Sequence, residues 1–241
     1  MVLVLFGTEL SPGVRAVLLT LRALELEHEF RHVDLLAGQH LEPHFVRKNP
    51  QRTVPVLQDN DACIWDSHAI MGYLVGKYAF TDALYPRDPL KRALVDQRLH
   101  FDSGILFVLF KQLQHLIFQE EVTELPNVLI EQLHKAYDLL EQFLDGRNYL
   151  AGQLLTIADF SIVATLSTLH LSYAPVDAAK YPKLSDWLTR ISHLPYYEEA
   201  NQRGARRMAE MVRAKLPKQF DKLWLKAFEE IKSGAGRQPL K

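Results

Sequence analysis

The feature that most constrains the fold is a short apolar run that leads within a few residues into a helix-forming stretch, residues 2–24 (VLVLFGTELSPGVRAVLLTLRAL). The apolar run at 2–6 predicts a buried strand. Apolar residues then return at positions 14, 17, 18, 21 and 24, close to the helical period of about 3.6 residues. A strand, a turn and a helix in such close succession predict the start of an α/β unit.

Ser11 stands where this turn meets the helix. Pro12 fits the first helical turn because the N–H group that proline lacks has no partner there, so Ser11 is expected at or next to the N-cap. The unpaired backbone N–H groups and the positive end of the helix dipole favour a bound anion, to which the hydroxyl can donate a hydrogen bond. An ordinary helix cap without a ligand is the alternative interpretation.

The first 80 residues follow the order β-α-β-α-β-β-α, which predicts an α/β domain with a mixed four-stranded sheet. After the first strand and helix, the expected elements are a strand at 28–35, a helix at 41–48, strands at 54–59 and 62–66, and a helix at 68–78. Ser67 is the expected cap of the last helix. Pro55 predicts an edge strand, the first residue of a strand or a cis peptide bond.

Strand patterns end at residue 80. Residues 81–88 are expected to form a linker between a domain of residues 1–80 and an all-helical domain of residues 89–241. The predicted helices cover residues 90–118, 126–144, 156–171, 182–193, 196–216 and 218–231. The helix at 156–171 opens with Thr156 and Asp159, a capping box with aspartate in place of glutamate, and is apolar enough to lie surrounded by protein.

The bulk composition argues against several classes of protein. The net charge is −1 and the pI near 6.8, so no excess of positive charge indicates nucleic acid or an anionic membrane as a partner. The apolar runs are too short to span a bilayer, and no charged-then-apolar signal segment opens the sequence. Cys63 is the only cysteine, which excludes a disulfide within the chain. We therefore expect a cytoplasmic protein without a bound metal, because the histidines also lack metal-ligand spacing.

Six motifs occur in one order along residues 1–215, and together they are more specific than any one of them. They are LSPGVRAV (10–17), NPQRTVPVL (49–57), DSHAI (66–70), HFDSG (100–104), LTIADFS (155–161) and LPYYEEAN (194–201). In this arrangement the chain resembles the cytosolic glutathione transferases, most closely the insect epsilon class, with the delta class as a near neighbour. The resemblance implies a thioredoxin-like N-terminal domain that binds glutathione, a helical domain that binds a hydrophobic substrate, and a homodimer.

The resemblance also assigns roles to matching residues. Ser11 is similar to the catalytic serine whose hydroxyl stabilises the bound thiolate. Val54 resembles the residue whose backbone pairs with the cysteinyl part of glutathione, and Pro55 resembles the cis-proline that exposes this backbone. Asp66 and Ser67 resemble the pair that holds the γ-glutamyl end.

His40 resembles a contact near the glycyl carboxylate of glutathione. Arg52 stands where the epsilon pattern has histidine, and a permanent cation there can hold the same carboxylate by a charge-assisted bond or can point away from it. Gly13 stands where a second proline is common. This glycine loosens the start of the helix, and no functional reason for it is evident.

The apolar electrophile is expected to lie against the helical domain, in a pocket that residues from both domains line. The aromatic candidates have an equally good interpretation as core residues between helices. The full set of candidates is Pro12, Leu35, Phe107, Phe110, Lys111, Gln114, Phe118, Met208 and Met211.

Three further sites have structural interpretations. Asp102 is expected to support a contact between domains or subunits, and His68 to be a structural or dimer-contact residue. The basic stretch at 203–207 is expected to be a solvated helix start, with attraction of anionic substrates as the alternative.

The predicted activity is conjugation of glutathione, the co-substrate, to hydrophobic electrophiles. A cysteine thiol with a pKa of about 8.5 is mostly protonated at neutral pH, whereas the thiolate is the nucleophile, so the site must favour the charged form. A non-catalytic carrier of hydrophobic ligands is the alternative from another class, and a glutathione peroxidase side activity stays open. A disulfide exchanger requires cysteine at the first turn, where this chain has Ser11.

Overall fold

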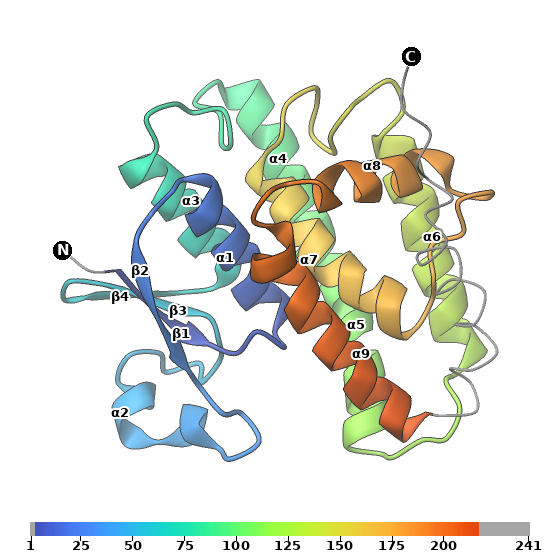
Figure 1. Cartoon of the computed structure of the whole chain (residues 1–241), viewed down its shortest axis with the longest axis horizontal. Helices are drawn as coiled ribbons and strands as arrows, with labels where there is room; N and C mark the ends of the chain where they lie inside the picture. The colour runs from blue at the N-terminus through green and yellow to red at the C-terminus, as the bar shows by residue number, and fades with distance from the viewer. Residues whose placement is uncertain (1–2, 217–241) are drawn as a thin grey trace.

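A mixed four-stranded sheet forms the centre of the N-terminal domain in the computed structural model, which describes residues 3–216 (Figure 1). The strands are β1 (Leu3–Gly7), β2 (His28–His32), β3 (Val56–Asp59) and β4 (Ala62–Trp65), in the order β2-β1-β3-β4. β1 is parallel to β2 and antiparallel to β3, and β3 and β4 form a hairpin. The predicted mixed sheet is therefore confirmed.

The two faces of β1 bury different side chains, as the alternation of a strand requires. Leu3 and Leu5 belong to the large core that includes the helices on one face, whereas Val4 and Phe6 pack with Phe45 in a smaller cluster on the other. The elements around the sheet are α1 (Pro12–Ala23), the 3₁₀ turn η1 (Gln39–Leu41), α2 (Pro43–Val46) and α3 (Ser67–Tyr78).

The C-terminal domain is helical throughout its described part, which ends at residue 216. Its elements are α4 (Pro89–Phe101), η2 (Asp102–Leu106), α5 (Phe107–Phe118), α6 (Asn127–Phe143), α7 (Ile157–Ser172), α8 (Pro182–Ser192), η3 (Glu198–Gln202) and α9 (Arg203–Lys215). Helices of the two domains pack directly, because α1 contacts both α7 and η3.

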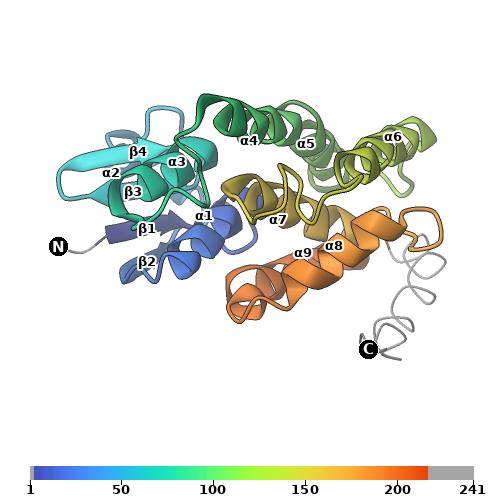
Figure 2. The ribbon, with the colours of Figure 1, turned by 90° about the horizontal axis from the view of Figure 1, so that it is seen from above.

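α7 is the central helix of this domain, as predicted from its apolar composition. Figure 2 shows it between α4, α5 and α6 on one side and α8 and α9 on the other. The predicted capping box is present: Asp159 Oδ2 accepts from the backbone N–H and the hydroxyl of Thr156, both at 2.9 Å. Asp159 Oδ1 also accepts from Trp187 Nε1 of α8 at 3.0 Å, so this aspartate joins two helices.

Several sequence predictions need correction. The helices expected at 90–118 and 196–216 are each interrupted by a π-helical turn, η2 and η3. Such a turn is a short insertion within an α-helix, and the stretches on both sides of it keep the helical period, so a search for periodicity reads one helix. For Pro55 the cis alternative is confirmed: its peptide bond with Val54 is cis. Pro55 marks neither an edge strand nor the first residue of a strand, because it precedes the central strand β3. The helix expected at 218–231 lies outside the described residues.

The cap of α3 is a further correction. Asp66 and not Ser67 is the N-cap, since its Oδ1 accepts from the backbone N–H groups of His68 and Ala69 at 2.9 and 3.1 Å. Ser67 is the first residue of the helix. Within residues 3–216, no helix has the length and apolar character needed to cross a membrane.

Asp59 ties the end of β3 to α3. Its Oδ2 accepts from Tyr73 and Lys77 at 2.6 Å and from Tyr78 at 2.5 Å. These hydrogen bonds, first that of Lys77, lower the pKa of Asp59 from 3.8 to about 2. Because the folded pKa is the lower one, the stabilisation is complete above about pH 4 and is lost as the pH falls toward 2.

Asp59→Asn is expected to lower the free energy of unfolding at neutral pH by about 1–3 kcal/mol, because charged hydrogen bonds are lost. The variant should also lose the steep fall in stability below about pH 4. Urea unfolding between pH 2 and 7 measures both effects. Asp61→Asn, in the exposed turn of the same hairpin, is the matched control and should leave stability nearly unchanged.

Candidate functional site

Ser11 is the N-cap of α1, as predicted. Its backbone N–H donates to Thr8 O at 3.0 Å, and its Oγ accepts from the backbone N–H of Val14 at 3.5 Å. The second bond is long, and it uses only an acceptor position of the hydroxyl. Within residues 3–216 no hydrogen bond uses the hydrogen of the half-buried Ser11 hydroxyl, which lies at the positive end of α1.

The starts of α1, β3 and α3 meet beside Ser11. A Cβ on Gly13 would lie 3.3 Å from Pro55 Cδ and 3.3 Å from Ser67 Oγ, so three segments far apart in sequence converge here. The peptide bond between Val54 and Pro55 is cis. The absence of a side chain at position 13 thus permits the close approach of α1 to the other two segments.

A pocket lies where this convergence faces the C-terminal domain. Four sequence-predicted residues line it together: Pro12, Asp66, Ser67 and Phe107. The other lining residues are Gly13, Ala16, His68, Asp102, Ser103, Ser161 and Thr165. The pocket therefore combines a helix N-terminus, an exposed carboxylate at Asp66 and a half-buried aromatic ring at Phe107.

Asp66 adopts an unusual backbone conformation at the edge of this pocket. Its φ is 73°, in the region that non-glycine residues rarely occupy and that aspartate tolerates better than most. The two capping bonds of Oδ1 hold this conformation.

His40 and Arg52 stand on separate loops. His40 lies in η1, and its Nδ1 is buried with no hydrogen-bond partner among the described residues. Arg52 is exposed and has a φ of 59°. Among the described residues, neither forms a hydrogen bond with Ser11.

Of the candidates for the hydrophobic pocket, only Pro12 and Phe107 line the pocket described above. Phe107 packs against Phe110 with ring centroids 5.7 Å apart, and Phe110 is buried in the large core. Gln114 donates to Tyr173 Oη at 2.6 Å and lies 3.4 Å from Met208 Sδ, which brings α5 and α9 together. Leu35 and Lys111 are exposed, Phe118 and Met211 half-buried, and Pro12 and Met208 buried.

A polar chain that periodicity alone does not reveal crosses between the domains beside the pocket. Ser161 Oγ donates to Asp102 Oδ2 at 2.5 Å, and His68 Nε2 lies 2.7 Å from the same Oγ. Because the serine proton goes to Asp102, His68 Nε2 must be the donor to Oγ. Asp102 and His68 thus join the two domains, as expected for Asp102. In the sequence, the one signal that could have identified Ser161 and Thr165 is that they are polar residues within an apolar helix.

Arg15 is a second buried polar residue that sequence analysis missed. Its Nη1 donates to Asn201 Oδ1 at 2.7 Å and to Ser167 Oγ at 3.2 Å, and its Nη2 donates to Ala164 O at 3.0 Å and to Thr168. Burial lowers the pKa of Arg15 to about 9, so it remains charged at neutral pH. Its partners fix the docking of α1 on α7 and η3.

The basic stretch at 203–207 is not simply solvated. Arg203 and Arg207 form ion pairs with Glu9 in the loop before Ser11, and Gly204 lies beneath that loop. A Cβ on Gly204 would collide with the carbonyl oxygen of Glu9 and lie 2.8 Å from Arg15 Cδ. α9 therefore packs tightly against the loop that carries Ser11.

No group of three or more His, Cys, Asp or Glu residues suited to a metal ion occurs within residues 3–216.

Comparison with known proteins gives matches over both domains. The profile of the glutathione S-transferase N-terminal domain matches residues 1–76, and that of the glutathione S-transferase C-terminal domain matches residues 109–196. Glutathione S-transferase 1 of Manduca sexta is 46% identical over 218 residues, which cover 90% of this chain and 100% of that protein.

Solved structures give the same result. An epsilon-class glutathione S-transferase from the housefly Musca domestica has a TM-score of 0.87 at 48% identity, covering 88% of this chain and 98% of that chain. A glutathione transferase homologue from Drosophila mojavensis, solved with bound glutathione, has a TM-score of 0.87 at 46% identity, covering 89% and 98%. The resemblance to the insect epsilon class that the motifs indicated is confirmed.

Gly204→Ala is expected to lower the free energy of unfolding by roughly 1–3 kcal/mol, because the added methyl group overpacks the contact with the Ser11 loop. Gly76→Ala is the matched control: a Cβ there meets no atom within 4 Å on the exposed side of α3, so the helix should be stabilised by up to about 1 kcal/mol. Denaturant unfolding measures both. Equal effects of the two substitutions would contradict the close packing described above.

Proposed function

We propose that this chain, which belongs to the glutathione S-transferase family, joins the sulfur of glutathione to small apolar electrophiles. The observation that carries the proposal is the Ser11 hydroxyl at the N-terminus of α1, with its hydrogen free to donate. In this proposal residues 1–80 bind glutathione, and the helical part from residue 89 binds the electrophile.

Ser11 would stabilise the thiolate and would not itself be the nucleophile. A hydroxyl donor and the positive end of a helix both favour the charged form of a thiol and so lower its pKa. The thiolate then attacks the electrophile, a carbon–sulfur bond forms, and the leaving group departs with the bonding electrons. The proton released on ionisation goes to solvent.

The remaining parts of glutathione have partners in the same region. We assign the backbone of Val54 to the cysteinyl part, Asp66 and Ser67 to the γ-glutamyl end, and His40 and Arg52 to the glycyl carboxylate. The cis bond before Pro55 and the convergence of residues 13, 55 and 67 support this assignment. The buried, unpartnered Nδ1 of His40 supports a ligand at η1.

The electrophile would lie between Pro12 and the α5–α9 side of the helical domain. Phe107 shares the pocket with Pro12, which supports an apolar wall next to the thiolate. The contact of Gln114 with Met208 supports an extension of this wall toward α9.

We further propose a cytoplasmic homodimer. The exposed side of η2 and α5 carries Ile105 and Val108, which are 39% and 41% exposed, close to Asp102 and Ser103 of the pocket. Apolar side chains at the rim of a site favour a partner surface there. Light scattering at micromolar concentration tests the assembly.

Ser11→Ala is expected to lower turnover with a chloronitrobenzene substrate by on the order of 10²-fold, because the donor to the developing charge is lost. The Kd for glutathione should change little, since the contacts of the rest of the tripeptide remain. Steady-state kinetics and isothermal titration measure the two quantities. Ser11→Thr keeps the hydroxyl and should retain most of the turnover.

Full turnover in Ser11→Ala would contradict the assigned role of Ser11. Tight binding of apolar ligands, without conjugation of glutathione to any electrophile, would instead support a carrier on the same fold. Turnover of hydroperoxides by the wild-type protein would add a peroxidase activity of the same thiolate.

A further inference from the structure

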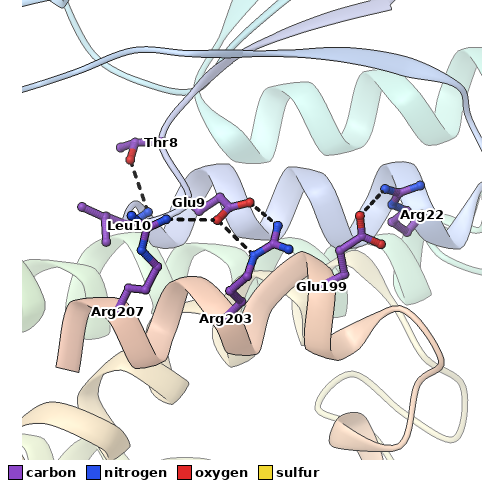
Figure 3. Close-up of polar contacts among 7 residues, drawn as sticks. All are labelled: Thr8, Glu9, Leu10, Arg22, Glu199, Arg203 and Arg207. Atoms are coloured by element: carbon purple, nitrogen blue, oxygen red, sulfur yellow. Dashed lines mark hydrogen bonds and ion pairs between the residues drawn. The ribbon is translucent and has the colours of Figure 1, made fainter. Parts of the chain in front are cut away.

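Glu9 places a negative charge two residues before Ser11, on the loop that leads into α1. Figure 3 shows its carboxylate pointing toward α9 and contacting Arg203 and Arg207. Arg203 hydrogen-bonds both carboxylate oxygens, with its Nε donating to Oε2 at 3.3 Å, and Arg207 Nη1 lies 3.8 Å from Oε2. The three charges therefore form one cluster that joins the Ser11 loop to the C-terminal domain.

The position of this cluster is fixed by packing of the backbone. Gly204, between the two arginines, leaves no room for a side chain against the carbonyl of Glu9. The loop itself is held by the bonds of Leu10 N–H to Thr8 Oγ1 at 3.4 Å and of Ser11 N–H to Thr8 O at 3.0 Å. The backbone of α9 is thus packed directly against the loop that carries both Glu9 and Ser11.

Stability alone is a poor explanation for the cluster. The side chains of Arg203 and Arg207 are 51% and 65% exposed, and exposed ion pairs contribute little to folding. The domains are already joined by the buried contacts of Arg15 and by the Arg22–Glu199 pair. Glu9 stands two residues before Ser11, the proposed donor to the thiolate, and this position calls for a different explanation.

An unpaired carboxylate at Glu9 would oppose a thiolate held by Ser11, because like charges disfavour the ionised form of a neighbouring thiol. We propose that Arg203 and Arg207 are positioning residues that neutralise Glu9, so that the loop before Ser11 adds no net negative charge beside the bound thiolate. This inference rests on the proposed function of Ser11.

The other charges around the loop do not replace these arginines. From α1, Arg15 is buried against the oxygens of α7, and Arg22 pairs with Glu199 of η3 at 2.7 Å. Arg206 pairs with Glu198 at 2.7 Å. α7 presents the hydroxyls of Ser167 and Thr168 to Arg15. Loss of Arg203 and Arg207 therefore leaves the charge of Glu9 without its two ion-pair partners.

The test is the pKa of the glutathione thiol in its complex with the full-length enzyme, measured by ultraviolet absorbance of the thiolate across pH. The double variant R203Q/R207Q is expected to raise this pKa by about half a unit or more. The acid limb of the pH profile of kcat/KM should move to higher pH by the same amount. Adding Glu9→Gln to this background should reverse at least half of the shift.

Arg206→Gln is the matched control for Arg207→Gln, because each removes one positive charge from the same helix turn and only Arg207 contacts Glu9. It should move the thiol pKa by less than a third of the shift in the double variant. R203K/R207K keeps both positive charges, so its thiol pKa should stay close to that of the wild type. In about 1 M salt, where the Debye length is about 3 Å, the shift in R203Q/R207Q should shrink.

Three results would overturn the proposal: an unchanged thiol pKa in folded R203Q/R207Q, an equal shift in Arg206→Gln, or no reversal by Glu9→Gln. Thermal unfolding shows whether each variant is folded. If the double variant does not fold, Arg207→Gln alone takes its place and is expected to raise the thiol pKa by a smaller amount. Failure of the proposed function looks different, because the wild-type enzyme itself would then neither lower the thiol pKa nor conjugate glutathione.

Discussion

The buried guanidinium of Arg15 is the interaction on which the placement of the site depends. A cation removed from water must have nearly all of its donors satisfied, or its burial is strongly unfavourable. Within the described residues its partners are neutral oxygens of α7 and η3. These bonds of the two Nη atoms hold α1 against α7 and η3, whereas Nε has no hydrogen-bond partner among the described residues. Ser11, one helical turn before Arg15, is positioned by the same docking.

Around Ser11 the protein assembles several weak sources of positive potential in place of a strong base. The N-terminus of α1 supplies partial charges, the hydroxyl supplies a donor, and Arg15 lies buried one turn away. Glu9 is the opposing charge, and α9 meets it with two arginines. In the proposed enzyme, a thiolate would therefore be favoured by an arrangement that both domains build. That explains why the pocket lies at the junction and not within the sheet domain.

The prediction from sequence succeeded where local pattern and local structure coincide. The strand-to-helix unit with Ser11 as its cap, the mixed sheet and the capping box of Thr156 and Asp159 all follow from short-range rules. It failed where the backbone departs from regular geometry for a long-range reason. The π turn η2 carries Asp102, which is buried against Ser161 of α7. The cap of α3 is Asp66 and not the predicted Ser67, and no sequence pattern indicates the positive φ of Asp66.

The sequence by itself determined which segments become strands and helices, because periodicity and capping act within a few residues. It also determined the hydroxyl at the first turn and the family to which the chain belongs. The tertiary structure alone decided that Pro12, Asp66, Ser67 and Phe107 share one pocket, that Arg15 is buried, and that Arg203 and Arg207 contact Glu9. Apart from the neighbours Asp66 and Ser67, these residues lie 40 to almost 200 positions apart in the sequence. Contacts over such separations are set by how helices pack and not by any local pattern.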